Sequence, residues 1–219
     1  MILFLSVIGL SVLAGHLLGG RLRIFERLRL RWWGLAPLGL ALQAIPLPDA
    51  RHGTDLLVRV VVLSSSFLLL LLFVAFNFRL AGMWLLFIGL TLNFAVIAAN
   101  GGMPVSRHAL EASGQADVLQ LLLKDQGAKH HLLTSDDNLT FLADVIPVAG
   151  PIEQVVSVGD VSVYLGLAWL IVSVMRGRTG ALAPASELGR YRGRHRLGTA
   201  GAPRSAPTHP AATTLGTGP

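Results

Sequence analysis

Five long apolar runs constrain this chain more than any other feature. They cover about residues 1–20, 32–48, 56–78, 80–99 and 155–175. A helix needs roughly 17–25 apolar residues to cross a bilayer. Only 14% of the 219 residues are charged, against about 25% in an ordinary soluble domain. We therefore predict an all-α integral membrane protein: a bundle of about five transmembrane helices with one structured extracytoplasmic loop.

Two of these runs need separate treatment. The run at 32–48, "WWGLAPLGLALQAIPLP", is the shortest and contains Pro37, so a re-entrant or interfacial segment is the alternative to a full crossing. The first run lacks the positive n-region and the A-x-A cleavage site of a signal peptide. Five arginines follow it directly, within 21–31. We interpret it as an uncleaved span.

The distribution of basic residues predicts how the chain is threaded. With the N-terminus outside, 13 of the 18 basic residues lie on the cytoplasmic side, in the 21–31 loop, at Arg79 and in the tail. Cytoplasmic loops carry the excess of Lys and Arg. We therefore predict a multi-pass protein of the cell membrane with a cytoplasmic C-terminus. Residues 1–175 form its transmembrane domain, and 176–219 form a disordered basic tail without apolar periodicity.

The predicted external loop, 100–154, carries seven acidic and three basic residues. Ser106 can cap the N-terminus of a helix that continues to about Lys124, although Gly114 weakens it. "SDDNLTFLADVIP" (135–147) predicts a second short amphipathic helix that ends before Pro147.

Polar residues at a common depth suggest a layer inside the bundle. Asp160 lies about five residues into the last run, and a charge within a membrane has a partner or faces water. Arg59 is the only basic residue inside a span, so we predict that it pairs with Asp160. The layer is then either a structural clamp or a site for a solute, proton or ion. Its candidate members are Asp160, Arg59, Asn93, Gln43, Ser157 and Tyr164.

Two loop motifs have local explanations. In "NGGMPVS" (100–106), Asn100 and Gly101 suit the left-handed conformation that ends a helix, and Pro104 prevents its continuation; an anion-binding turn of backbone N–H groups is the alternative. "KHHLLTSDDN" (129–138) gathers two histidines and two aspartates without the spacing of a metal site. We interpret it as a polar surface loop and predict no metal.

Small residues recur at helical spacing in two of the runs. Ser11, Gly15 and Gly19 are four residues apart, and Gly159, Gly166 and Ser173 are seven apart. Such stripes let two helices approach closely. We predict that both stripes are packing surfaces.

Three pieces of sequence carry a family resemblance: "NGGMPVS" (100–106), "FLADVIPVAGP" (141–151) and "VVSVGDVSVYLG" (155–166). With "LALQ" (40–43), they make residues 1–175 similar to a family of small bacterial polytopic membrane proteins, domain of unknown function family 5317. The resemblance implies no activity. It implies that the family's motifs include Asn100, Gly101, Gly102, Pro104, Asp144, Pro147, Gly159 and Asp160.

The sequence leaves several functional classes open. We favour a non-enzymatic membrane component that organises or partners other membrane proteins or copies of itself in the lipid bilayer. The alternative is a small carrier or binding protein for a polar solute or ion, which would use the layer around Asp160. An enzyme comes third, because no P-loop, dinucleotide fingerprint or nucleophile elbow occurs. We predict no cofactor and no specific nucleic-acid partner. The basic segment "RYRGRHR" (190–196) is explained as an orientation signal in a solvated tail, and binding of anionic lipid headgroups or RNA is the alternative.

Overall fold

The computed structural model describes residues 2–45, 53–124 and 129–178. All of them belong to one compact unit, Met1–Ala183; the second unit, Pro184–Pro219, lies outside the described residues, as does most of the predicted tail.

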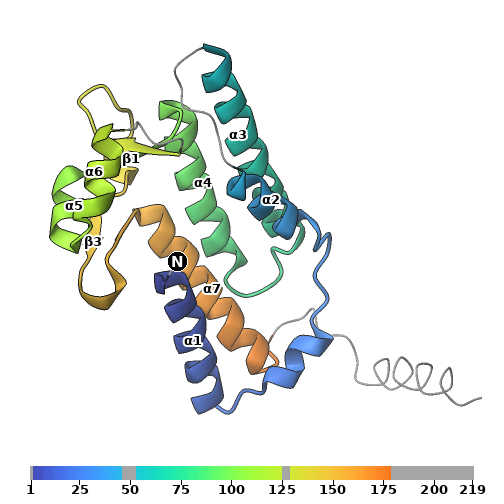
Figure 1. Ribbon diagram of the computed structural model, residues 1–219. Helices are drawn as coiled ribbons and strands as arrows, with labels where there is room; N and C mark the ends of the chain where they lie inside the picture. The colour runs from blue at the N-terminus through green and yellow to red at the C-terminus, as the bar shows by residue number, and fades with distance from the viewer. Residues whose placement is uncertain (1, 46–52, 125–128, 179–219) are drawn as a thin grey trace, which may run out of the picture. The chain divides into compact units, whose positions relative to one another are not determined.

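The described residues are mostly helical, as the sequence predicts (Figure 1). Three helices have segments long and apolar enough to cross a membrane: Leu57–Phe76, Met83–Asn100 and Val158–Met175. The helices that contain them are α3 (Gly53–Phe76), α4 (Met83–Asn100) and α7 (Val158–Met175). They correspond to three of the five predicted spans.

The other two apolar runs form shorter helices, α1 (Ile2–Leu17) and α2 (Leu35–Ala44), separated by the 3-10 helix η1 (Leu22–Arg27). At about 1.5 Å per residue, α2 rises roughly 15 Å, about half of the ~30 Å hydrocarbon core. It is therefore shorter than the run at 32–48 suggested, and the end of that run lies outside the described residues.

Glycines set the packing between helices. α7 lies along α4, α1 packs against α7, and α2 packs against α3 (Figure 1). Between α4 and α7, a Cβ on Gly89 or Gly159 would collide with the facing helix. Gly166 faces the N-terminal turn of α4 in the same way. Gly15 of α1 meets Met175. Gly15, Gly159 and Gly166 are therefore packing positions, as predicted. Gly19 is not, because it follows the end of α1 with a φ of 80° and no atom lies within 4 Å of its Cβ position.

Residues 101–157, here called the connecting region, join α4 to α7 and contain four strands that the sequence analysis did not predict. β1 pairs in parallel with β2, and β3 pairs antiparallel with β4. Each strand has three residues, too few for a period of two to stand out. Its elements are β1 (Met103–Val105), α5 (Arg107–Ser113), α6 (Ala116–Lys124), β2 (His130–Leu132), η2 (Thr140–Leu142), β3 (Ile146–Val148), η3 (Gly150–Ile152) and β4 (Gln154–Val156).

The single helix predicted from Ser106 to Lys124 is two helices. The Ser106 hydroxyl caps α5 as expected, accepting from the N–H of Ala109 at 3.3 Å. Gly114 then adopts a left-handed φ of 85° and ends α5, so it stops the helix rather than only weakening it. Leu110 and Leu119 still reach a common core with Val155.

The helix predicted at 135–147 is wrong. Only Thr140–Leu142 forms a 3-10 turn, preceded by Leu139 at a positive φ of 54°. The backbone of Asp144 is bonded to the start of the connecting region: its N–H donates to Pro104 at 3.0 Å, and its carbonyl accepts from Ser106 at 2.9 Å. These long-range bonds replace the bonds that a helix would have formed.

Candidate functional site

Asp160 is part of a helix cap. It is the third residue of α7, and it forms a capping box with Ser157. The Ser157 hydroxyl accepts from the Asp160 N–H at 3.0 Å, and the Ser157 N–H donates to Oδ2 of Asp160 at 3.0 Å. A carboxylate in the first turn also interacts favourably with the helix dipole. Asp160 therefore lies nearer the start of the helix than the apolar run implied.

Asn93 of α4 links this cap to the neighbouring helix. Its Nδ2 donates to Oδ1 of Asp160 at 2.7 Å, and its Oδ1 accepts from the Ser157 hydroxyl at 3.0 Å. Gly159 lets the amide lie this close, because a Cβ there would overlap Asn93. Asn93, Ser157 and Asp160, here called the polar triad, are three of the six predicted members of the layer.

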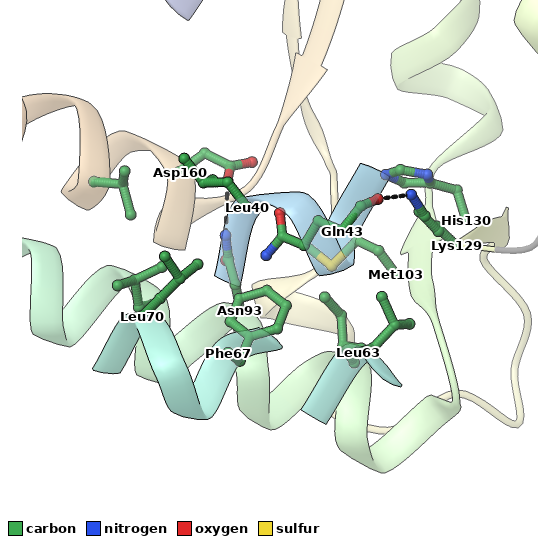
Figure 2. A pocket seen from close by; sticks show the side chains of 13 residues that line it. Leu40, Gln43, Leu63, Phe67, Leu70, Asn93, Met103, Lys129, His130 and Asp160 are labelled. Atoms are coloured by element: carbon green, nitrogen blue, oxygen red, sulfur yellow. Dashed lines mark hydrogen bonds between the residues drawn. The ribbon is translucent and has the colours of Figure 1, made fainter. Parts of the chain in front are cut away.

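A cavity of about 380 Å³ opens beside the polar triad. Asn93 and Asp160 line it, as does Gln43, a further predicted member, from α2 (Figure 2). Much of the remaining wall is apolar and includes Leu63, Phe67 and Leu70 of α3. An apolar pocket with a few converging polar groups is the usual form of a small-molecule site.

Lys129 and His130 of the connecting region also line the cavity. The Lys129 ammonium donates to the backbone carbonyl of Gln43, in the last turn of α2 (Figure 2). Carbonyls in that turn lack helical partners, and a cation there is favoured by the helix dipole. The Lys129 carbonyl accepts from Met103 at 2.7 Å, which fixes the segment beside α4.

His130, in β2, lines the cavity beside Lys129. Desolvation lowers the pKa of His130 below its ordinary 6.5, and the Lys129 charge acts in the same direction, while the Asp160 carboxylate opposes both. His130 is therefore a neutral imidazole at pH 7. Neither Lys129 nor His130 was predicted in the layer, because the pairing of β1 with β2 joins residues 27 positions apart, such as Met103 and His130.

The other two predicted members of the layer lie elsewhere. Tyr164 lines a separate apolar pocket of about 410 Å³ between α1 and α7. Arg59 is 6% exposed on α3, and it is not among the residues that line the cavity. Within the described residues, Asp160 accepts from Asn93 and Ser157 and forms no ion pair with Arg59. The predicted Arg59–Asp160 pair is therefore wrong, because neutral donors and a helix N-terminus stabilise the carboxylate.

Asp144 is a buried carboxylate in the connecting region. It is 7% exposed, and within the described part of the chain its Oδ1 has no hydrogen-bond partner. Burial raises the pKa of Asp144 to about 8, and the negative charge of Asp160 contributes. Asp144 is therefore mostly protonated at pH 7.

The remaining motif residues have structural roles. Gly101, at φ 68°, ends α4, and Asn100 binds the backbone of Asn138 through both ends of its amide. Gly102 lies against the 129–131 segment. Pro104 is in β1 and Pro147 in β3.

The two histidines of the 129–138 loop differ in surroundings. His130 lines the cavity, whereas Nε2 of His131 lies 2.8 Å from Oδ1 of Asp137. Across residues 2–45, 53–124 and 129–178, no three side chains of His, Cys, Asp or Glu are grouped so that they could hold a metal ion.

Comparison with known sequences places this arrangement in a family. Residues 27–172 match the profile of the "Family of unknown function (DUF5317)". This stretch includes the polar triad, the cavity wall and the connecting region. The chain belongs to this family.

The chain is also similar to an "Uncharacterized protein" of Thermotoga maritima, with 35% identity over 122 residues, which is 54% of this chain and 67% of that protein. No solved structure matches the chain. For this DUF5317 member, the cavity and its polar wall are thus the features on which a functional argument can rest.

Proposed function

We propose that this protein is a multi-pass membrane protein that binds a small amphipathic ligand in the cavity beside the polar triad. The observation that carries the proposal is the cavity itself: about 380 Å³, with Gln43, Asn93 and Asp160 on a largely apolar wall. Sites for small molecules commonly have about 300–1,000 Å³ and this mixture of surfaces.

The surface of the helices supports a membrane location. Large apolar side chains are more than 40% exposed on each of the three long helices, among them Leu68, Trp84 and Leu165. Soluble monomers rarely expose apolar surface on this scale, whereas helices that contact lipid need an apolar outer surface. Five crossings remain our proposal, in which α2 provides only part of one.

The distribution of charges supports the proposed threading. The arginine-rich segment 21–31 lies at the end of the bundle where α1 and α7 finish, since the Arg21 N–H donates to the Met175 carbonyl at 2.8 Å. The connecting region is at the opposite ends of α4 and α7. With the basic end in the cytoplasm, the cavity opens toward the extracytoplasmic half of the membrane.

The cavity favours a binding protein or carrier over the organising component that the sequence suggested first. A helix clamp needs only the polar triad, and the triad is satisfied within itself. The cavity wall also contains Gln43, Lys129 and His130. A clamp between α4 and α7 does not need these three residues. Partner proteins and self-association remain predictions.

Native mass spectrometry of the purified protein tests this function. The test compares two substitutions on α3: Leu70→Trp fills the cavity, because Leu70 lines it, whereas Leu68 is 51% exposed on the outer surface. We expect a small molecule to co-purify with the wild type and with Leu68→Trp, and to be lost from Leu70→Trp. Retention in Leu70→Trp, or no bound molecule in the wild type, would contradict a cavity ligand.

A further inference from the structure

Two helix ends of opposite polarity contribute to the cavity wall. The N-terminus of α7 bears Asp160, and the C-terminus of α2 bears the carbonyl of Gln43, to which Lys129 donates. Both charged side chains line the cavity. His130 lines the same cavity as both side chains.

The helix dipoles reduce these charges without cancelling them. A helix end carries about half a unit charge, and its sign is opposite to that of the charged side chain that caps it. About half a negative charge therefore remains at Asp160, and about half a positive charge at Lys129. Asp160 uses Oδ1 for Asn93 and Oδ2 for Ser157, so each oxygen keeps a second acceptor site. The Lys129 ammonium likewise has further N–H donors beyond the one given to Gln43.

This pattern selects the charge of a ligand. A single cation would satisfy Asp160 but add net charge to a largely apolar cavity that Lys129 also lines, and a single anion would do the reverse. Net charge in such surroundings is costly. A molecule with both charges meets both ends and leaves the site neutral.

We propose that the cavity ligand is a zwitterion with an apolar body, its ammonium group at Asp160 and its anionic group at Lys129. This inference rests on the proposed function and specifies its ligand class. The apolar body lies against Leu63, Phe67 and Leu70 of α3, and neutral His130 donates or accepts a hydrogen bond between the two charged ends. Two sources share this chemistry: a free apolar amino acid and an aminophospholipid headgroup.

A panel of probes with the full-length protein in detergent at pH 7 tests the ligand class. L-leucine is compared with 3-methylbutylamine, which lacks the carboxylate, and with 4-methylpentanoate, which lacks the ammonium. Lysophosphatidylethanolamine is compared with lysophosphatidylglycerol. Affinity is measured by isothermal titration calorimetry. We expect at least one zwitterion to bind ten-fold or more tightly than its singly charged counterparts, and the preferred zwitterion identifies the source.

Variants connect binding to the two ends of the cavity. Asp160→Asn and Lys129→Gln should each weaken zwitterion binding ten-fold or more. The matched controls, Asp117→Asn and Arg107→Gln, change exposed residues outside the cavity and should bind as the wild type does. If a variant does not fold, the probe panel on the wild type still decides the question.

The zwitterion proposal is overturned if a singly charged probe binds as tightly as its zwitterion, if neither zwitterion binds, or if the controls lose as much affinity as the cavity variants. The proposed function has a separate outcome. If Leu70→Trp displaces a co-purified molecule that lacks either charge, the cavity is a binding site and only the zwitterion assignment fails.

Discussion

Asn93 on α4 donates a hydrogen bond of 2.7 Å to the Asp160 carboxylate on α7. The same amide accepts from Ser157 at 3.0 Å. One neutral side chain thus joins the start of α7 to α4 and contributes to the cavity wall. This contact takes the place of the arginine pair that the sequence suggested.

Asn93→Ala removes both interhelical bonds. A hydrogen bond to a charged group contributes about 1.5–3 kcal/mol, so we expect a stability loss of about that size in detergent unfolding. Thr91→Ala is the control on the same helix, because its exposed hydroxyl donates to the Phe87 carbonyl of that helix, at 2.7 Å. Equal losses for the two variants would show that the interhelical bonds contribute little.

Double-mutant cycles separate Asn93 from Arg59 as the partner of Asp160. Contacting residues couple, whereas independent ones add. We expect a clear coupling energy between Asn93→Ala and Asp160→Ala, and a smaller one between Arg59→Ala and Asp160→Ala, both measured by the same unfolding assay. A larger coupling energy between Arg59 and Asp160 would show that these two residues form the ion pair after all.

Gly159→Ala tests the close contact of α4 with α7. The new Cβ would overlap the Asn93 amide and the Gly89 carbonyl, and overpacking typically costs about 1–3 kcal/mol. We expect a loss at the upper end, because the Gly89 carbonyl is backbone and cannot rotate away. Gly9→Ala is the control: no atom lies within 4 Å of its Cβ position, so it should be neutral or stabilising in a helix. A stable, monodisperse Gly159→Ala protein would refute this packing.

Asp144 should make stability depend on pH. Its folded pKa of about 8 lies above the ordinary 3.8, so the stability that it contributes is complete below pH 3.8 and is lost as pH rises through about 8. The lowered pKa of His130 acts in the opposite direction, mainly below its ordinary 6.5. Between pH 6.5 and 8 we therefore expect the wild type to lose at most about 1.4 kcal/mol per pH unit.

Asp144→Asn cannot ionise and should remove that slope in unfolding measured at pH 6.5 and 8.5. Asp117→Asn, at an exposed position of α6, should keep it. An unchanged slope in Asp144→Asn would mean that another group titrates.

The threading can be tested with reporters. A reporter active only in the cytoplasm should work at the C-terminus and fail when it is inserted near Gln126, because the basic residues favour the opposite end of the bundle for the cytoplasm. Cytoplasmic activity at the Gln126 site would place the connecting region and the cavity on the other side.

The tail should be dispensable for folding. Deletion of residues 184–219 removes only the second unit and leaves Met1–Ala183 intact, so we expect unchanged membrane accumulation and melting temperature. A marked loss of either would show that the first unit needs the tail.

Some of the site was visible in the sequence. Depth along the apolar runs brought together Gln43, Asn93 and Asp160, because helix rise converts residue number into height. The spacing of Ser157 and Asp160 is also that of a capping box, a local signal that would have placed the start of α7 correctly. Neither pattern shows which neighbouring helix a side chain faces. Arg59, included for its depth, and Tyr164, included for its helix face, therefore do not line the cavity.

The sequence by itself determined the apolar helices, their glycine stripes and the helix ends at Ser106 and Gly101, since these depend on local backbone preferences and on periodicity. The tertiary structure alone decided the partner of Asp160, the pairing of β1 with β2, and the placement of Lys129 and His130 on the cavity wall. Those contacts join segments far apart in the chain. Their free energy comes from hydrogen bonds and burial between elements, which no local pattern of residues records.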